Sequence, residues 1–374
     1  MTSCAQMISD IAAELKTRGA RVNVAGIGGE HHVEAHPRSI YSQRLKSPRL
    51  IVRAASECIA SLRLGIKLQL MMLRGEIARP TLIIVYQPSL FLTFTASLIR
   101  LHPKQSKLLI VQRDIVPDWL IASGRIKPGV ATWALSKLKD FSLKNADWIG
   151  IECAENNAYV PDRFRHKTFV LNNWRNFESH AVHDPATPNS VQTSFIYGGR
   201  VGVAQGFDRF LHAFCDANVP ATSLKIYCDE RGKQELATVA LTESQRSRVF
   251  VNDMVVETEF LESARHATFG VITLAPELRT HNIPGKLLAY LAAGIPVFVV
   301  APRDSALRRI ISELDCGVSC AAENPDEILD MLRVVLNDGG QRRNHCAQNI
   351  ATARRYFDVK LAADAIEHRL HAQA

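Results

Sequence analysis

The stretch H-N-I-P-G-K-L-L-A-Y-L-A-A-G-I-P-V-F-V-V-A, residues 281–301, decides the fold of this 374-residue chain. Pro284 suits the first position of a helix, Gly294 suits its end, and residues 297–300 form a short apolar run typical of a buried strand. Free N–H groups and a positive dipole lie at the start of such a helix, with Lys286 beside them. The stretch therefore predicts a loop, a helix and a strand, and either an anion site or an ordinary crossover helix with a surface lysine.

A second turn of the same character lies roughly 80 residues earlier, in F-I-Y-G-G-R-V-G-V-A-Q-G-F-D-R-F, residues 195–210. A short apolar strand precedes its glycines, and Gly206 opens an amphipathic helix. Glycines let the backbone approach a ligand closely, and the guanidinium of Arg200 suits phosphate oxygens. Two such turns indicate a phosphate-binding site more strongly than either does alone.

The chain resembles retaining glycosyltransferases of the GT-B fold, family four. It is most similar to the bacterial branch that transfers amino- or deoxy-sugars, such as L-fucosamine transferases, to envelope polysaccharide precursors. The resemblance rests on four segments, which occur in the family's order and spacing: R-D-I-V-P-D at 113–118, N-N-W at 172–174, Y-G-G-R-V-G-V-A-Q-G-F-D at 197–208 and I-P-G-K-L-L-A-Y-L-A-A-G-I-P-V at 283–297. It covers nearly the whole chain. The resemblance implies that the Asn-Trp pair lies near the junction of the two domains, where Trp174 could either pack or bind a ligand.

The resemblance implies an α/β fold of two Rossmann-like doubly wound domains that face a cleft. We expect an acceptor-side domain over 1–180, a nucleotide-sugar-binding domain over 191–356, and a C-terminal helix or tail over 357–374. The alternation of strand and helix patterns along the chain, followed by two helices over 325–337 and 341–356, independently predicts parallel sheets. Residues 180–190 are polar and contain prolines, as inter-domain linkers do.

The beginning of the chain departs from the family. Family members open with a strand and a glycine-rich loop, whereas residues 3–18 of this chain have the apolar spacing of a helix. The first strand of the N-terminal domain is therefore missing from the expected pattern. Either the true start of the protein lies upstream of Met1, or the protein is degenerate.

The implied activity is transfer of a sugar, a hexose or an amino- or deoxy-sugar, from a nucleoside-diphosphate sugar to a lipid-diphosphate-linked glycan, as in lipopolysaccharide synthesis. Asp114 follows the strand over 108–112, where it could orient an acceptor hydroxyl, whereas Asp118 could be only a helix cap. Arg200 and Lys286 would stabilise the leaving diphosphate, so we expect no metal and no cofactor beyond the sugar nucleotide. The candidate donor-binding residues are Gly198, Gly199, Gln205, Gly206, His281, Asn282, Ile283, Pro284, Gly285 and Tyr290.

Several departures from the family keep a second hypothesis open. Family members carry two glutamates separated by seven residues, and His281 and Ala289 stand at those positions here. Loss of such a carboxylate contact to the ribose would cost roughly 1–3 kcal/mol of donor binding. The segment 227–233 has also lost most of the family's glycines, and Gln205 replaces a basic residue. The alternative is thus a donor-site-degenerate scaffold, while a sugar-nucleotide epimerase is disfavoured because no matching set of carboxylates is present.

The charge of +8 is unevenly distributed. Residues 1–180 hold 25 Lys and Arg against 14 Asp and Glu, whereas residues 181–374 hold 20 against 23. A basic first half favours an anionic partner such as a membrane face or a diphosphate-linked lipid, although a solvated basic surface is the simpler alternative. No recognition motif supports nucleic acid. The basic amphipathic segment 49–79 could lie on an anionic membrane or pack in the first domain's core.

The eight scattered cysteines show no metal-ligand spacing, so reduced thiols in a cytoplasm are the simplest account. Asp10 and Glu14 interrupt the first apolar positions, which argues against a signal peptide. The longest uncharged run, 80–99, is divided by Gln87 and Pro88 into a strand, L-I-I-V-Y at 82–86, and a helix. We therefore expect a cytoplasmic protein, with peripheral attachment to the inner face of the cytoplasmic membrane as an option.

Overall fold

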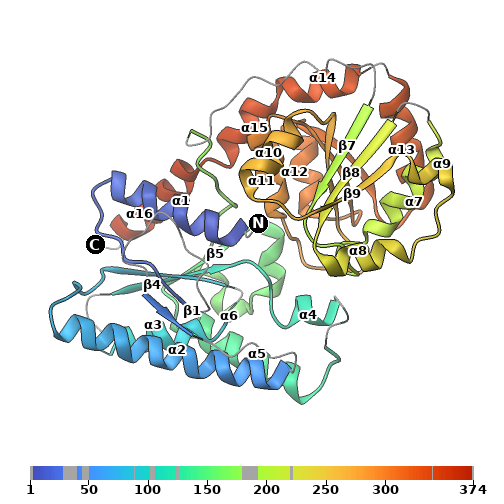
Figure 1. Ribbon diagram of the computed structural model, residues 1–374. Coiled ribbons are helices and arrows are strands. Elements are labelled where there is room, and N and C mark those ends of the chain that lie inside the picture. Colours follow the sequence, from blue (N-terminus) through green and yellow to red (C-terminus); the bar gives the residue numbers. More distant parts are fainter. Residues whose placement is uncertain are drawn as a thin grey trace. The chain divides into compact units, whose positions relative to one another are not determined.

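The computed structural model describes residues 3–27, 40–43, 50–87, 89–101, 106–122, 124, 126–178, 193–219, 222–338 and 340–372. The chain forms two compact units, which Figure 1 shows. The C-terminal unit is Arg175–Asp358, and the N-terminal unit is Cys4–Trp174 together with the closing helix α16 (Val359–His371). The division thus falls between residues 174 and 175, whereas the predicted linker, 180–190, lies outside the described residues.

The C-terminal unit is built on a six-stranded parallel sheet. Its strands are β7 (Thr193–Gly198), β8 (Thr222–Cys228), β9 (Val249–Asp253), β10 (Phe269–Thr273), β11 (Val297–Ala301) and β12 (Gly317–Ala321). Their spatial order is β12-β11-β10-β7-β8-β9. Counted from the first strand of the unit, this is the doubly wound order 3-2-1-4-5-6 read from the opposite edge. The order confirms the predicted Rossmann-like architecture and places β7 next to β10.

The helices of this unit follow the predicted alternation, with one correction. They are α7 (Phe207–Ala217), α8 (Glu230–Ala237), α9 (Glu243–Arg246), α10 (Glu257–Arg265), α11 (Gly285–Ala293), α12 (Ala306–Leu314), α13 (Pro325–Asn337), α14 (Gln341–Gln348) and α15 (Ile350–Tyr356). The single helix predicted over 341–356 is two helices that meet at Asn349. The side-chain amide of Asn349 donates to the carbonyl oxygen of Asp315 at 3.2 Å, so the break has a tertiary cause.

Aromatic side chains fill the core of the C-terminal unit. Phe195 on β7 is fully buried and meets Phe210 and Phe214 of α7 at ring-centroid distances of 5.8 and 5.9 Å. Phe269 on the adjacent strand β10 and Phe298 on β11, the next strand along, contact the same ring. Because the first strand and the first helix share one buried cluster, the turn between them is held on a rigid base.

The N-terminal unit has a four-stranded parallel sheet of order β3-β4-β5-β6 and a separate parallel pair, β1 and β2. Its strands are β1 (Ala25–Ile27), β2 (Ile40–Ser42), β3 (Leu82–Tyr86), β4 (Lys107–Gln112), β5 (Trp148–Ile151) and β6 (Thr168–Val170). Its helices, besides α16, are α1 (Ser3–Thr17), α2 (Leu50–Leu73), α3 (Leu92–Ile99), α4 (Asp118–Ala122), α5 (Val130–Asn145), the 3₁₀ helix η1 (Ala154–Tyr159) and α6 (Asp162–Arg165). The predicted opening helix is therefore confirmed, and the strand at 82–86 matches its predicted bounds.

Helices cover both faces of the four-stranded sheet, with α2, α3 and α5 on one side and α1 and α16 on the other (Figure 1). Arg18, the residue after α1, links α1 to α16, since its guanidinium lies 2.6 Å from Asp364 and 2.8 Å from Glu367 of α16. None of the helices in the described ranges combines the length and hydropathy that a membrane-spanning helix requires.

Candidate anion-binding site

The C-terminal sheet reverses its winding between β7 and β10, which are paired through Phe195 and Phe269. In doubly wound sheets, ligands bind beyond the carboxyl ends of the strands at this reversal. The loop after β7 carries the glycine turn, and the loop after β10 leads to α11. A hydrogen bond from the N–H of Ala275 to the carbonyl of Ala204, at 3.1 Å, ties the two loops together. The two turns singled out in the sequence therefore lie side by side.

The glycines of the first turn are required by close packing and by backbone conformation. A Cβ added to Gly198 would lie 2.5 Å from the ring of Phe260. Gly199 has φ +122° and Gly206 has φ +55°, both in the region that favours glycine. Gly206 precedes the first residue of α7, and a Cβ there would meet Ala275 at 3.0 Å. The turn thus gives close backbone approach at the start of a buried helix.

Lys286 extends from the first turn of α11 back over this glycine turn. Its ammonium lies 3.6 Å from the centroid of the Tyr197 ring, and a Cβ on Gly199 would be 3.0 Å from its Cε. No carboxylate pairs with this half-buried cation among the residues that the structure describes. Burial lowers the pKa of Lys286 from 10.5 to about 7. A bound anion would restore the charged form.

Tyr197 and Tyr290 support the turn from below. The hydroxyl of Tyr197 donates to the carbonyl of Arg200, which fixes the backbone of the turn. Tyr290 is fully buried, and its hydroxyl accepts from the N–H of Gly198 at 3.3 Å while lying 3.2 Å from the carbonyl oxygens of Ile196 and Val271. We predicted Tyr290 as a donor-binding residue, but it lies in the core, because its ring occupies the space that the absence of a side chain at residue 270 leaves open.

Arg200 and Gln205 occupy the outer part of the turn. Arg200 is exposed, and the structure gives its guanidinium no carboxylate partner among the described residues. Gln205 is half-buried, with its N–H donating to the carbonyl of Gly202 at 2.9 Å. Arg200 is therefore a candidate to contact an anion bound at this turn.

The loop before α11 combines structural and unsatisfied groups. The Nδ1 of His281 accepts from the N–H of Ala306, the first residue of α12, at 3.3 Å, so His281 is oriented by a second helix start. Pro284 precedes α11, Gly285 is its first residue, and Ile283 is buried. The backbone N–H of Asn282 donates to the carbonyl of Thr280 at 3.0 Å.

Two oxygen atoms in this loop are buried and have no hydrogen-bond partner among the described residues. They are Oγ1 of Thr280 and Oδ1 of Asn282. An unsatisfied buried acceptor is costly, so such atoms suggest a missing donor such as a ligand hydroxyl. Sequence reasoning did not single out Thr280 or Tyr197; the position of Tyr197 directly before the glycine pair was the signal available.

Ala289 is the position at which the sequence resemblance led us to expect a glutamate. It lies on α11 with its side chain buried. A carboxylate there would be removed from water and would have to displace well-packed neighbours. The alanine is consistent with the local packing of this chain.

Asp114 lies in the N-terminal unit, just beyond the carboxyl end of β4, and it is half-buried. Asp118 is paired with Lys139, whose ammonium lies 2.9 Å from its carboxylate, and it begins α4. Asp118 is thus the first residue of the helix rather than the residue that precedes it, and its carboxylate is held by Lys139. Asp114 therefore stays the candidate acceptor-side carboxylate of its own sheet edge.

Arg113 and Trp174 form a buried structural cluster next to Asp114. The guanidinium of Arg113 donates to the carbonyls of Leu171 at 3.0 Å and Asn172 at 3.2 Å, and it lies 5.0 Å from the Trp174 ring. The indole N–H of Trp174 donates to the carbonyl of Met7 at 2.7 Å. Of the two roles left open for Trp174, packing is the one that the structure supports.

Comparison with known proteins gives no match to a family model and none to a curated protein. Solved structures do match. Sucrose-phosphate synthase from Thermosynechococcus elongatus has a TM-score of 0.72 at 12% identity, over 97% of this chain and 92% of its own. HepE of Anabaena in complex with UDP has a TM-score of 0.69 at 12% identity, over 99% of this chain and 96% of its own. WaaG, a glycosyltransferase involved in lipopolysaccharide biosynthesis, has a TM-score of 0.63 at 16% identity, over 97% of this chain and 95% of its own. The chain therefore has the GT-B fold of these glycosyltransferases.

Proposed function

We propose that this chain is a retaining glycosyltransferase that moves a sugar from a nucleoside-diphosphate sugar to a glycan acceptor. The observation that carries the proposal is the position of the Lys286 ammonium. A cation without a carboxylate partner among the described residues is held over a glycine turn, at the reversal point of a doubly wound sheet. A diphosphate is the ligand that this combination of glycine backbone and cation suits.

Each residue of the site has a defined part in this reaction. The donor diphosphate would lie between the glycine turn and the start of α11, where the N–H groups of Gly285 and Lys286 point toward it. Negative charge builds up on the leaving diphosphate in the transition state. Lys286, Arg200 and these N–H groups would stabilise that charge, so the proposal assigns no role to a metal ion. The unsatisfied oxygens of Thr280 and Asn282 would accept from donor hydroxyls.

The finer assignments rest on the order of the four sequence motifs. On that basis we place the chain in family four and propose an amino- or deoxy-sugar donor and a lipid-diphosphate-linked acceptor, in bacterial surface polysaccharide synthesis. Asp114 would orient the acceptor hydroxyl. All eight cysteines are unpaired, which supports a cytoplasmic location. WaaG, described as acting in lipopolysaccharide biosynthesis, is a structural neighbour that fits this assignment.

A non-catalytic scaffold is the second candidate, and Ala289 is the observation that favours it. A protein without the ribose-binding carboxylate could have kept the fold and lost the donor. The two candidates differ in one respect that is simple to measure, since only the transferase must bind a nucleoside diphosphate.

A thermal-shift screen against UDP, GDP, dTDP and their sugars tests the proposal, with UDP first because HepE was solved with it. The variants are Lys286→Met, which keeps the apolar stem on Tyr197, and Arg200→Ala. Lys225→Ala is the matched control, since Lys225 is an exposed lysine on β8 of the same unit. We expect one nucleotide to raise the melting temperature of the wild type. The rise should be smaller in Lys286→Met and Arg200→Ala, and as large as in the wild type in the Lys225→Ala control. If no nucleotide shifts the wild type, the donor site is refuted and the scaffold is favoured.

Retention has its own test. With the donor that the screen selects and a suitable acceptor, proton NMR of the first product gives its anomeric configuration before any exchange. The same configuration as the donor supports retention, and the opposite one would overturn it.

A further inference from the structure

An exposed apolar stripe runs along the outer side of α2. Its members have exposed fractions of 40 to 67%: Val52, Ile59, Leu62, Ile66, Leu70 and Leu73. Since successive residues of a helix are about 100° apart, all of them lie within about 40° of Ile66 around the axis. The buried residues Leu64 and Leu68 lie about 160–200° away and pack with Ile40 in a core cluster. The stripe is therefore a second apolar face, opposite the one that the fold uses.

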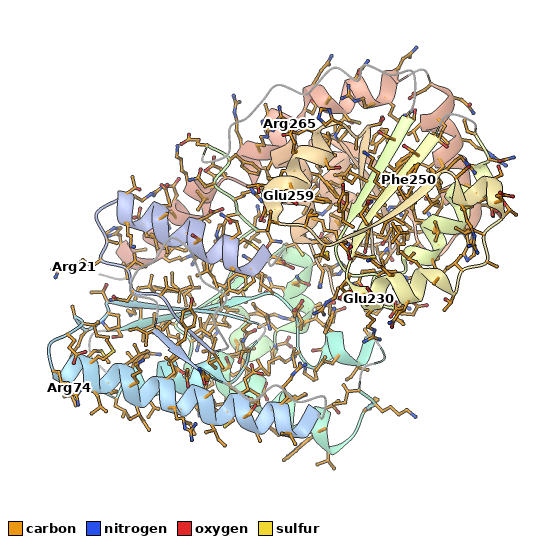
Figure 2. The ribbon with its side chains drawn as sticks, in the orientation of Figure 1. Arg21, Arg74, Glu230, Phe250, Glu259 and Arg265 are labelled. Carbon is orange, nitrogen blue, oxygen red and sulfur yellow. The ribbon has the colours of Figure 1, made fainter. Side chains whose placement is uncertain are left out.

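Cations line one edge of the stripe. Arg63, Lys67 and Arg74 lie between about 60° and 100° from Ile66 by the same geometry. Neither Arg63 nor Lys67 has a carboxylate partner within the described ranges, and the exposed Arg74 is 3.8 Å from Glu76. Figure 2 labels Arg74 just beyond the end of α2.

The two kinds of side chain meet at the C-terminal end of the helix. There they border a hollow of about 400 Å³, lined by Arg63, Ile66, Lys67, Leu70, Met71, Arg74 and Glu76. Aliphatic walls with three cations around them suit a ligand that joins an acyl chain to a phosphate. Lysine and arginine stems can lie along such walls while their charges stay at the water boundary.

A second copy of this chain fits the face poorly. Glu57 is the only acidic residue of α2, and it lies about 180° from the stripe, on the buried side. An opposing α2 would thus bring apolar side chains but no carboxylate for Arg63 and Lys67. An anionic lipid surface supplies acyl chains for the stripe and phosphate groups for the cations.

We propose that the outer face of α2 docks on the surface of an anionic lipid bilayer. The stripe would lie at the boundary of the acyl chains, with Arg63, Lys67 and Arg74 at lipid phosphates, as in amphipathic helices that lie in the membrane plane. Under this proposal the two roles left open for residues 49–79 are compatible, because one side of α2 packs in the core while the other would face lipid. The inference stands independently of the proposed transfer reaction.

The test is co-sedimentation of the full chain with vesicles of phosphatidylcholine alone and of phosphatidylcholine mixed with phosphatidylglycerol. We expect binding only to the anionic vesicles, weakened by added salt. The triple variant Arg63→Gln, Lys67→Gln, Arg74→Gln should lower the partition coefficient roughly 100-fold, at about fivefold for each cation. Ile66→Ser with Leu70→Ser should also lower it, and neither variant should change the far-UV circular dichroism.

The matched control removes three exposed cations from the C-terminal unit, by Lys225→Gln, Arg231→Gln and Arg342→Gln. It should bind anionic vesicles nearly as well as the wild type. An equal loss in the control would mean that net charge alone drives binding, and it would overturn the assignment to α2. Absence of wild-type binding would overturn it too. So would a dimer in sedimentation velocity that the serine variant dissociates while vesicle binding is unchanged, since a second copy would then cover the face.

Discussion

The pKa of Lys286 makes a specific prediction about how donor binding depends on pH. In the free protein, burial places this pKa at about 7, so the ammonium loses its proton as the pH rises through that value. A bound diphosphate favours the protonated form and raises the pKa. Binding above neutral pH must therefore take up a proton, and the affinity must fall as the pH rises. A sugar nucleotide is the right ligand, because its diphosphate has no group that titrates near neutrality.

The size of the effect follows from the fraction of Lys286 that is charged. With the free pKa at about 7, this fraction drops from roughly 0.9 at about pH 6 to roughly 0.1 at about pH 8, so the dissociation constant should rise about tenfold. Lys286→Met removes the charge at every pH. A lost charge-assisted hydrogen bond of about 1.5–3 kcal/mol weakens binding roughly 10- to 150-fold at about pH 6 and abolishes the pH dependence.

Isothermal titration calorimetry measures both quantities. Titrations in buffers of different ionisation enthalpy count the protons taken up, which should be about half a proton at pH 7 for the wild type and none for Lys286→Met. Lys225→Met, at an exposed site of the same unit, should behave as the wild type. A wild-type affinity that is constant from about pH 6 to 8 would refute the titration argument. An unchanged affinity in Lys286→Met would refute the site itself.

Three further outcomes test the structural basis of the two units. Gly199→Ala should weaken nucleotide binding more than tenfold, as seen by calorimetry, because φ +122° is unfavourable for alanine and the methyl would press on Lys286; intact binding would contradict the tight fit of the turn. Gly270→Ala should lower the free energy of unfolding by about 3 kcal/mol in urea, since its Cβ would lie 2.3 Å from the Tyr290 ring, and a change below about 1 kcal/mol would contradict that contact. Arg113→Ala should cost about 3–5 kcal/mol in the same assay, because it leaves the carbonyls of Leu171 and Asn172 without this donor and removes the cation 3.8 Å from the buried carboxylate of Glu152; an unchanged stability would contradict these contacts.

The sequence predicted the elements of the C-terminal unit well, because its local signals are strong. Gly294 takes the left-handed conformation that ends α11, and the helix matches its predicted bounds, 285–293. The strand predicted at 195–197 is the centre of β7. Local signals do not determine the order of the strands, because that order is fixed by pairing between residues far apart in the chain. The segment 306–321, which holds α12 and β12, was not predicted.

The candidate site was predicted at the level of its two turns and not at the level of its side chains. The turns meet because parallel strands share a carboxyl edge, which a pattern of glycines and apolar runs can indicate. The fully buried hydroxyl of Tyr290 and the contact of His281 with α12 depend on tertiary packing. The close approach of Lys286 to the Tyr197 ring depends on side-chain conformation, which has no periodic signal in a sequence.

The alanine at position 289 does not by itself decide between a transferase and a scaffold. The variant Ala289→Glu, which introduces the expected glutamate, tests this. The position is only 3% exposed, so Ala289→Glu would bury a carboxylate and overfill the packing. We expect it to destabilise the fold by about 2–4 kcal/mol in urea and to leave nucleotide binding no tighter. A missing carboxylate contact weakens a donor by about 1–3 kcal/mol, or roughly 5- to 150-fold, which leaves a micromolar ligand still measurable. If Ala289→Glu instead tightened binding without loss of stability, the pocket would be open at this position and the alanine would mark a lost donor contact.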